Sequence, residues 1–305
     1  KSGAACNWWE DAEADFDRMQ AMGLNAHRLS VEWSRIEPEP GCYDGTAIER
    51  YRAMLSALID RGIRPMVCLH HFSNPLWLEA RGGWQNVDVV ERFQSFVRTT
   101  VTALRDLCTM WLTINEPQVY VNHAFVEGIF PPHAKSALAG LRVYRHMLLA
   151  HGVAYQTIHA LQPEAQVGNA SALRAYQGER PGARADAFAA AVHRYLGEDI
   201  WLKAIVGGFI LPPMGYGDWH PALRDSFDFV GINYYTRSLI RFAPNPLKFF
   251  GERKHQHGAE LSDSGRDGPY SWYSPKGLYD LCMAQNALGK PIYITENGLP
   301  DADDD

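Results

Sequence analysis

Short apolar segments bounded by turn residues alternate along the chain with longer segments whose apolar residues recur at helical spacing. Six short segments rich in Val, Ile, Leu or aromatic residues are predicted to be strands, at residues 25–30, 64–69, 110–115, 165–171, 227–235 and 291–295. Six longer segments are predicted to be helices, at residues 12–22, 47–61, 87–107, 137–161, 185–204 and 275–287. Each strand except the last is followed by a helix, which indicates repeated βα units and a parallel sheet.

This alternation favours one (β/α) barrel over two domains, because no Pro/Gly/Ser-rich linker or change of composition divides the chain. A doubly wound sheet is less favoured, since neither G-x-G-x-x-G nor G-x-x-x-x-G-K-[ST] is present. We therefore expect a single (β/α) barrel catalytic domain over residues 1–305. Two segments interrupt the alternation, residues 131–136 and the polar residues 243–274, and a connection as long as the second is typical of a functional loop.

A closed barrel of this class, (β/α)8, requires eight strands, and the pattern yields six. The sequence begins with a helix and stops soon after a strand. We therefore expect the first and last strands of the barrel to be missing and the given chain to be incomplete at both ends.

Composition narrows the class of protein further. The 305 residues are 46% hydrophobic and 21% charged, as in an ordinary soluble globular chain. A net charge of −6 repels a phosphate backbone, so we expect no nucleic-acid partner. No apolar segment approaches the roughly 20 residues that cross a bilayer, and residues 1–9 lack a signal-peptide pattern, so we expect a cytoplasmic protein without membrane contact. Five scattered cysteines without C-x-x-C indicate free thiols.

Two glutamates stand where a predicted strand ends. In Trp111-Leu-Thr-Ile-Asn-Glu-Pro117, Glu116 follows an apolar strand and precedes a proline. In Ile292-Tyr-Ile-Thr-Glu-Asn-Gly298, Glu296 lies where a strand gives way to a turn. The carboxyl ends of barrel strands carry catalytic residues, so the fold is expected to bring these two side chains to one opening.

A pair of carboxyl groups is what hydrolysis of a glycosidic bond requires. One group protonates the departing oxygen, and the second attacks the sugar or activates water. Glutamates at loop starts are also common on ordinary protein surfaces. Taken alone, each glutamate therefore leaves both interpretations open.

Five motifs in order resemble glycoside hydrolase family 1, the retaining β-glucosidase and β-galactosidase family. They extend over most of the chain: Asn25-Ala-His-Arg-Leu-Ser-Val-Glu-Trp-Ser-Arg-Ile36, Leu69-His-His-Phe-Ser-Asn-Pro75 with Gly82-Gly-Trp84, Thr113-Ile-Asn-Glu-Pro117, Gly231-Ile-Asn-Tyr-Tyr235 and Ile294-Thr-Glu-Asn-Gly298. By this resemblance Glu116 is the general acid and base and Glu296 the nucleophile. Arg28 matches the arginine that keeps the nucleophile ionised, and Tyr235 matches the tyrosine that hydrogen-bonds it.

The resemblance also bears on four further residues. Asn115 matches the asparagine that binds the hydroxyl next to the reacting carbon, and Asn233 is expected on the aglycone side or in the polar network. His71 matches the sugar-binding histidine, whereas its neighbour His70 is expected to be packed. A metal shared by the two is not expected, because adjacent strand residues point to opposite faces.

The implied reaction is a double displacement with retention, acting on a small β-glycoside or oligosaccharide and requiring no metal and no cofactor. Two alternatives remain: a retaining endo-β-1,4-glucanase on the same barrel, and a sugar-binding family member whose catalysis is impaired by truncation. Sugar preference is not determined, because the first- and last-strand residues that would match the family's sugar contacts are absent from the sequence.

Overall fold

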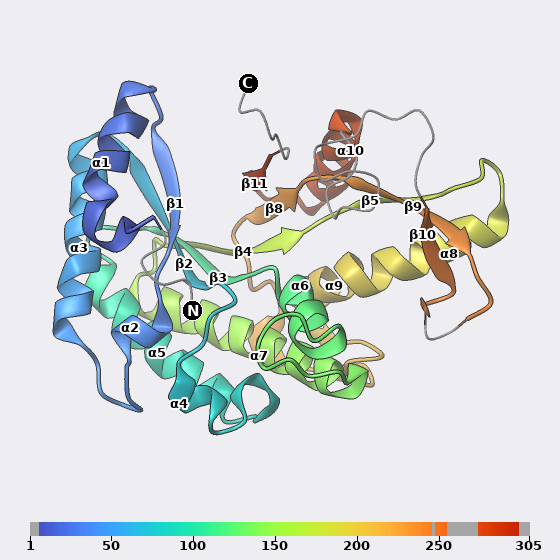
Figure 1. The fold of residues 1–305 in the computed structure, drawn as a ribbon, viewed down its shortest axis with the longest axis horizontal. Coiled ribbons are helices and arrows are strands. Elements are labelled where there is room, and N and C mark those ends of the chain that lie inside the picture. Colours follow the sequence, from blue (N-terminus) through green and yellow to red (C-terminus); the bar gives the residue numbers. More distant parts are fainter. Residues whose placement is uncertain (1–5, 246–247, 255–273, 299–305) are drawn as a thin grey trace.

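The computed structural model describes residues 6–245, 248–254 and 274–298. At its centre is a sheet of six parallel strands in the spatial order β1-β2-β3-β4-β8-β11 (Figure 1). These strands are β1 Ala26–Ser30, β2 Arg64–His70, β3 Met110–Asn115, β4 Gln166–Ala172, β8 Val230–Tyr234 and β11 Ile292–Asn297. All six predicted strands are present. Because every neighbouring pair is parallel, the carboxyl ends of all six lie at the same end of the sheet.

The predicted helices are also present. The longer ones are α1 Trp8–Ala21, α3 Gly45–Asp60, α5 Val89–Leu104, α7 Ala137–Leu161, α8 Arg184–Arg194, α9 Ile200–Gly207 and α10 Pro275–Gln285. The helix predicted at residues 185–204 consists of α8 and α9, joined by the π-helical turn η3 Tyr195–Asp199. Short helices follow several strands: α2 Trp33–Ile36, α4 Leu76–Glu79 and α6 Pro117–Val121. In the ranges described, none of the helices combines the length and apolar character needed to span a membrane.

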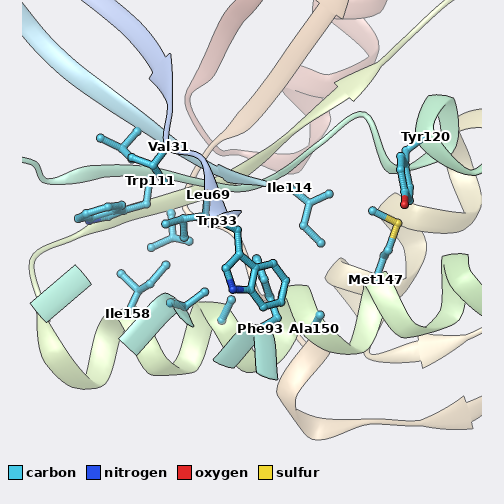
Figure 2. Packing of buried hydrophobic residues seen from close by; sticks show 14 of the residues in the cluster. Val31, Trp33, Leu69, Phe93, Trp111, Ile114, Tyr120, Met147, Ala150 and Ile158 are labelled. Atoms are coloured by element: carbon cyan, nitrogen blue, oxygen red, sulfur yellow. The ribbon is translucent and has the colours of Figure 1, made fainter. Parts of the chain in front are cut away.

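The main core lies between the sheet and the helices that cover its outer face. Figure 2 shows Trp33, Leu69, Phe93, Trp111 and Ile158 packed in this layer. A second, smaller cluster joins Cys68, Met110, Leu112, Ala170 and Phe229 from neighbouring strands. Strand β3 is buried along its entire length, as expected of a parallel strand covered on both faces.

A second, three-stranded sheet extends from the ends of β4 and β8 (Figure 1). It contains β5 Ala175–Gly178, β9 Arg237–Phe242 and β10 Gly251–Lys254, and α8 packs against it. A small hairpin of β6 Phe209–Ile210 and β7 Asp218–Trp219 follows α9. The hydrophobic pattern does not predict these short strands, and β10 lies within the predicted loop 243–274, so that prediction is wrong at residues 251–254. Residues 246–247 and 255–273 of that loop lie outside the described ranges.

Candidate active site

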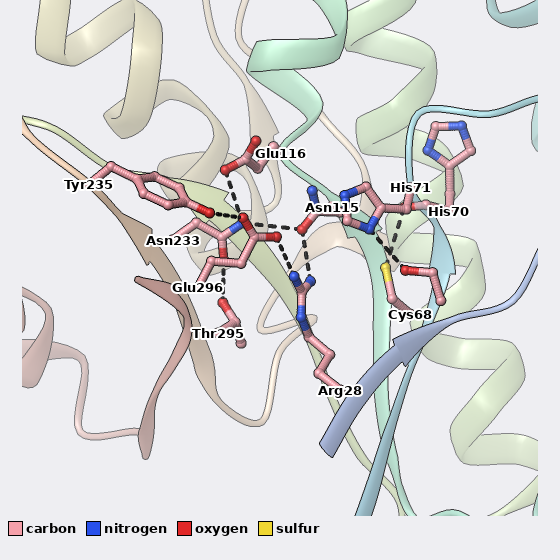
Figure 3. A network of polar contacts seen from close by, with 11 residues as sticks. Arg28, Cys68, His70, His71, Asn115, Glu116, Asn233, Tyr235, Thr295 and Glu296 are labelled. Carbon is pink, nitrogen blue, oxygen red and sulfur yellow. Dashed lines mark hydrogen bonds and ion pairs between the residues drawn. The ribbon is translucent and has the colours of Figure 1, made fainter. Parts of the chain in front are cut away.

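The seven residues assigned to the site from the sequence meet at the carboxyl end of the central sheet (Figure 3). They come from strands far apart in the sequence: Arg28 from β1, His71 after β2, Asn115 and Glu116 at the end of β3, Asn233 and Tyr235 at the end of β8, and Glu296 from β11. Hydrogen bonds connect six of the seven, and the seventh, His71, is hydrogen-bonded to Ser30 instead. The parallel order of the strands therefore places all seven side chains in one region.

Glu116 reaches this region through an irregular strand end. The β3–β4 register shifts between Leu112 and Asn115, and Glu116 then has φ 42° and ψ 58°. This left-handed conformation is uncommon for any residue with a side chain and is found most often where function requires it. The Glu116 backbone N–H donates to the Ala170 carbonyl of β4 at 2.7 Å, and Pro117 begins α6 immediately afterwards.

Glu296 occupies a similar irregularity in β11, an edge strand of the sheet. The β11–β8 register shifts between Ile294 and Glu296, so that Glu296 pairs with Asn233. Arg28 forms a salt bridge with its Oε1 atom, and the Tyr235 hydroxyl donates to Oε2 at 2.6 Å. Both oxygens thus accept from donors, an arrangement that suits a carboxylate.

Two asparagines connect the two carboxyl groups. Asn115 Oδ1 accepts from Arg28 Nη1 at 2.9 Å and from Asn233 Nδ2 at 3.2 Å. Asn233 Nδ2 also donates to Glu116 Oε1 at 2.9 Å, and its Oδ1 accepts from the Thr295 hydroxyl. A continuous chain of polar contacts therefore runs from Glu116 through both amides and Arg28 to Glu296 (Figure 3).

Asn115 has one further donor available. Its side chain is fully buried, and its Nδ2 atom makes no hydrogen bond to any group in the described residues. A buried N–H without an acceptor destabilises the protein unless water or a ligand satisfies it. Because the other end of this amide is held by Arg28 and Asn233, Nδ2 has a fixed direction in which to donate.

The two carboxyl groups have different surroundings. Burial, and to a lesser extent the negative charge of Glu296, raise the pKa of Glu116 from 4.5 to about 7. The hydrogen bond from Asn233 and the charges of Arg28 and Arg174 act in the opposite direction. Glu116 is therefore largely protonated in mildly acidic solution, while Glu296 is held by an arginine and a tyrosine. Such a pair can supply an acid and a nucleophile in one site.

The adjacent histidines have different surroundings. His71 is half-buried, its Nδ1 atom lies 2.9 Å from the Ser30 hydroxyl, and burial and Arg28 lower its pKa. His70 is buried against Trp84 and Tyr120, as predicted for a packed residue. Within the described ranges, no group of three or more His, Cys, Asp or Glu side chains could hold a metal ion.

Three residues near the site were not identified from the sequence. Thr295 and Ser30 lie inside quoted motifs and orient Asn233 and His71. Arg174 lies in no motif, and only its place two residues beyond β4 could have indicated it. Its guanidinium charge nevertheless acts on Glu116.

Beta-glucosidases are among the proteins whose sequences resemble this chain. The family model for glycosyl hydrolase family 1 matches residues 1–305. Beta-glucosidase A of Thermotoga maritima is 26% identical over 96% of this chain and 67% of its own length, and coniferin beta-glucosidase of Pinus contorta is 28% identical over 95% and 64%. The chain thus spans about two thirds of the length of these curated relatives.

Solved structures confirm the predicted barrel class. A beta-glycosidase from Pyrococcus horikoshii superposes with a TM-score of 0.88 at 33% identity, covering 98% of this chain and 68% of that one. A beta-glucosidase from Exiguobacterium antarcticum also gives 0.88 at 26% identity, covering 98% and 69%.

Proposed function

The chain belongs to glycosyl hydrolase family 1 and is a glycoside hydrolase, and we propose that it releases terminal β-linked sugars through Glu296 as nucleophile and Glu116 as general acid and base. The observation that supports this division of roles is the contrast between the two carboxyl groups. Glu116 is 8% exposed with a pKa raised to about 7, whereas Glu296 accepts from Arg28 and Tyr235.

In the first step, a Glu296 oxygen forms a bond to the anomeric carbon while the bond from that carbon to the glycosidic oxygen breaks. Glu116 gives its proton to the departing oxygen. Arg28 and Tyr235 each engage one oxygen of Glu296 and keep the carboxylate from rotating, and each oxygen retains a further lone pair for attack. The sugar is then an ester of Glu296.

In the second step, Glu116 acts as a base. Esterification removes the negative charge of Glu296, which is one of the causes that raise the pKa of Glu116. That pKa therefore falls, and Glu116 can take a proton from water as the water oxygen bonds to the anomeric carbon and the ester bond breaks. Two displacements at one carbon give net retention.

Asn115 and His71 are proposed to hold the sugar ring. The unpartnered Asn115 Nδ2 donor suits a sugar hydroxyl oxygen beside the reacting carbon. His71 is fixed by Ser30 through Nδ1, which leaves its Nε2 edge for a second hydroxyl. Neutral groups of this kind bind sugar hydroxyls without adding charge next to Glu296.

The experiment follows hydrolysis of 4-nitrophenyl β-glucoside and β-galactoside, with product stereochemistry read by proton NMR. We expect a retained product from the wild type. Glu296→Ala should lose at least a thousandfold in kcat, and azide should restore turnover with formation of the inverted glycosyl azide. Glu164→Ala, which changes an exposed glutamate far from the site, serves as the control. Azide rescue with inversion in Glu116→Ala instead would reverse the two roles.

A further inference from the structure

The side-chain amide of Asn74 joins two segments that carry residues of the site. Asn74 lies in the connection after β2, three residues beyond His71. Its Nδ2 atom donates to the Tyr120 hydroxyl at 2.7 Å. Tyr120 belongs to α6, the helix that begins directly after Glu116. One amide therefore links the segment that is proposed to bind the sugar to the helix that follows the general acid.

The orientation of this amide is fixed by a partner that can only donate. The indole nitrogen of Trp84, in η1 Gly83–Gln85, donates to Asn74 Oδ1 at 3.0 Å. His70 Nε2 lies 3.0 Å from the same oxygen, so Nε2 carries the ring proton. Burial lowers the pKa of His70 to about 4, which leaves the ring neutral with that single proton. Two donors thus occupy the oxygen of Asn74.

The nitrogen of the amide is used as fully as the oxygen. Besides Tyr120, Asn74 Nδ2 donates to Glu79 Oε1 of α4 at 2.7 Å. An amide has two N–H groups and an oxygen that accepts twice, so all four of its hydrogen bonds are made. His70, Trp84 and Tyr120 are at most 1% exposed. Loss of the amide would therefore leave several buried polar groups without partners.

The helix held by this amide fixes the backbone of Glu116. The backbone N–H groups of Val119 and Tyr120 both donate to the Glu116 carbonyl at 3.0 Å. Helix α6 has five residues, and a helix that short has little stability of its own. Contacts with other elements therefore set its orientation. Glu116 itself has φ 42°, a conformation that persists only where surrounding contacts hold it.

A second contact joins the same two segments. The Phe72 ring stacks on the Tyr120 ring, with an interplanar angle of 12° and 6.3 Å between centroids. It also packs edge-on against the His71 ring, with 5.0 Å between centroids. Phe72 has φ 70°, which is uncommon for a bulky residue and indicates that contacts impose the shape of this segment. Tyr120 thus contacts the segment after β2 through both its hydroxyl and its ring.

We propose that Asn74 is a positioning residue for the general acid. Through the Tyr120 hydroxyl it holds α6, and with it Glu116, at a fixed position relative to the segment that carries His71. The proton of Glu116 is then placed at the glycosidic oxygen of a sugar bound at His71. The inference rests on the proposed function, because it takes Glu116 as the group that protonates the departing oxygen.

The test compares hydrolysis of phenyl and 2,4-dinitrophenyl β-glucosides. Phenolate is a poor leaving group that needs the proton of Glu116, whereas 2,4-dinitrophenolate departs without it. The ratio of the two kcat/KM values reports how well the acid is placed, since a loss of folded enzyme lowers both values equally. Tyr120→Phe keeps the ring and removes the hydroxyl that Asn74 holds. We expect it to lower the phenyl to dinitrophenyl ratio on the order of tenfold, and Asn74→Leu to lower it further.

Tyr155→Phe is the matched control. Tyr155 donates its hydroxyl to Asp228 Oδ1 at 2.9 Å, and Asp228 precedes β8 at the amino end of the sheet. The control therefore loses a tyrosine hydrogen bond of similar length away from the strand ends that carry the site, and it should keep the wild-type ratio. The positioning role is wrong if Tyr120→Phe and Asn74→Leu lower both kcat/KM values by the same factor. It is also wrong if the ratio falls equally in Tyr155→Phe.

NMR titration of Glu116 separates this inference from the proposed function. The carbon-13 resonance of its carboxyl group is identified by its absence in Glu116→Gln. Burial is the main cause of its pKa of about 7, so release of α6 in Tyr120→Phe or Asn74→Leu should lower that pKa toward 4.5, and Tyr155→Phe should not.

The two measurements together assign any failure. If the wild type hydrolyses neither glucoside while the pKa of Glu116 falls in Tyr120→Phe and Asn74→Leu, the positioning role stands and the proposed function fails. If the wild type hydrolyses both glucosides, and neither the ratio nor the pKa changes in these variants, the proposed function stands and Asn74 has no positioning role.

Discussion

Placing Glu116 in a buried site should make the protein less stable as pH rises, and Glu116→Gln should remove that effect. The pKa of Glu116 rises from 4.5 to about 7 on folding. Below pH 4.5 the group is neutral in both the folded and the unfolded state and costs nothing. Between pH 4.5 and 7 the unfolded chain ionises first, so the free energy of unfolding falls. At 1.36 kcal/mol per pKa unit, the loss reaches about 3 kcal/mol above pH 7.

The assay is urea denaturation of wild type and Glu116→Gln from pH 4.5 to 8. Glutamine keeps an oxygen for the Asn233 Nδ2 donor and cannot ionise. The free energy of unfolding of the variant minus that of the wild type should therefore increase by about 3 kcal/mol from pH 4.5 to pH 8. Any effect of the substitution that does not depend on pH adds equally at both ends of the range. Glu164→Gln, at an exposed position, should show a flat difference. A flat or shrinking difference for Glu116→Gln refutes the reasoning.

Three further outcomes follow from named contacts. The wild-type kcat/KM should fall as pH rises above about 7, where Glu116 loses its proton. Because the charge of Arg174 lowers the pKa of Glu116, Arg174→Met should shift this fall in kcat/KM to higher pH. A shift to lower pH would contradict the sign of that effect. Arg28→Met removes a partner of both Glu296 and Asn115 and should lower kcat/KM for aryl β-glycosides on the order of a hundredfold or more, with unchanged circular dichroism. Gly231→Ala would place a Cβ 2.5 Å from the Asn169 carbonyl oxygen of β4, so urea denaturation should show a free energy of unfolding lower by about 1–3 kcal/mol. A variant as stable as the wild type would show that the two strands can move apart at no cost.

Much of the fold could be predicted because its signal is local. Strand β3 is apolar at four of its six positions, and α7 has a helical pattern with a serine N-cap at Ser136, so hydrophobic spacing indicates both. Strand β5, with the sequence Ala-Tyr-Gln-Gly, carries no such pattern. It is a strand because it pairs with β9, and that pairing joins segments about 60 residues apart.

The residues of the site likewise include some that the sequence indicates and one that it does not. Strand-end positions and motif order identified Glu116 and Glu296, because residue type and neighbours are properties of the chain. Arg174 could not be found this way. Its importance depends on the Glu198 carboxyl that holds its backbone and on its distance in space from Glu116, and no residue adjacent to it in sequence carries either property.

By itself the sequence determined which segments form the six central strands and the main helices, the parallel arrangement that brings the ends of those strands together, and which two glutamates stand at those ends. Only the tertiary structure decided how those glutamates differ. The register shifts in β3 and β11 position their side chains, burial raises the pKa of Glu116, and Arg28 forms a salt bridge with Glu296. The physical reason is that ionisation depends on solvent and on charges in space, which contacts between distant segments create.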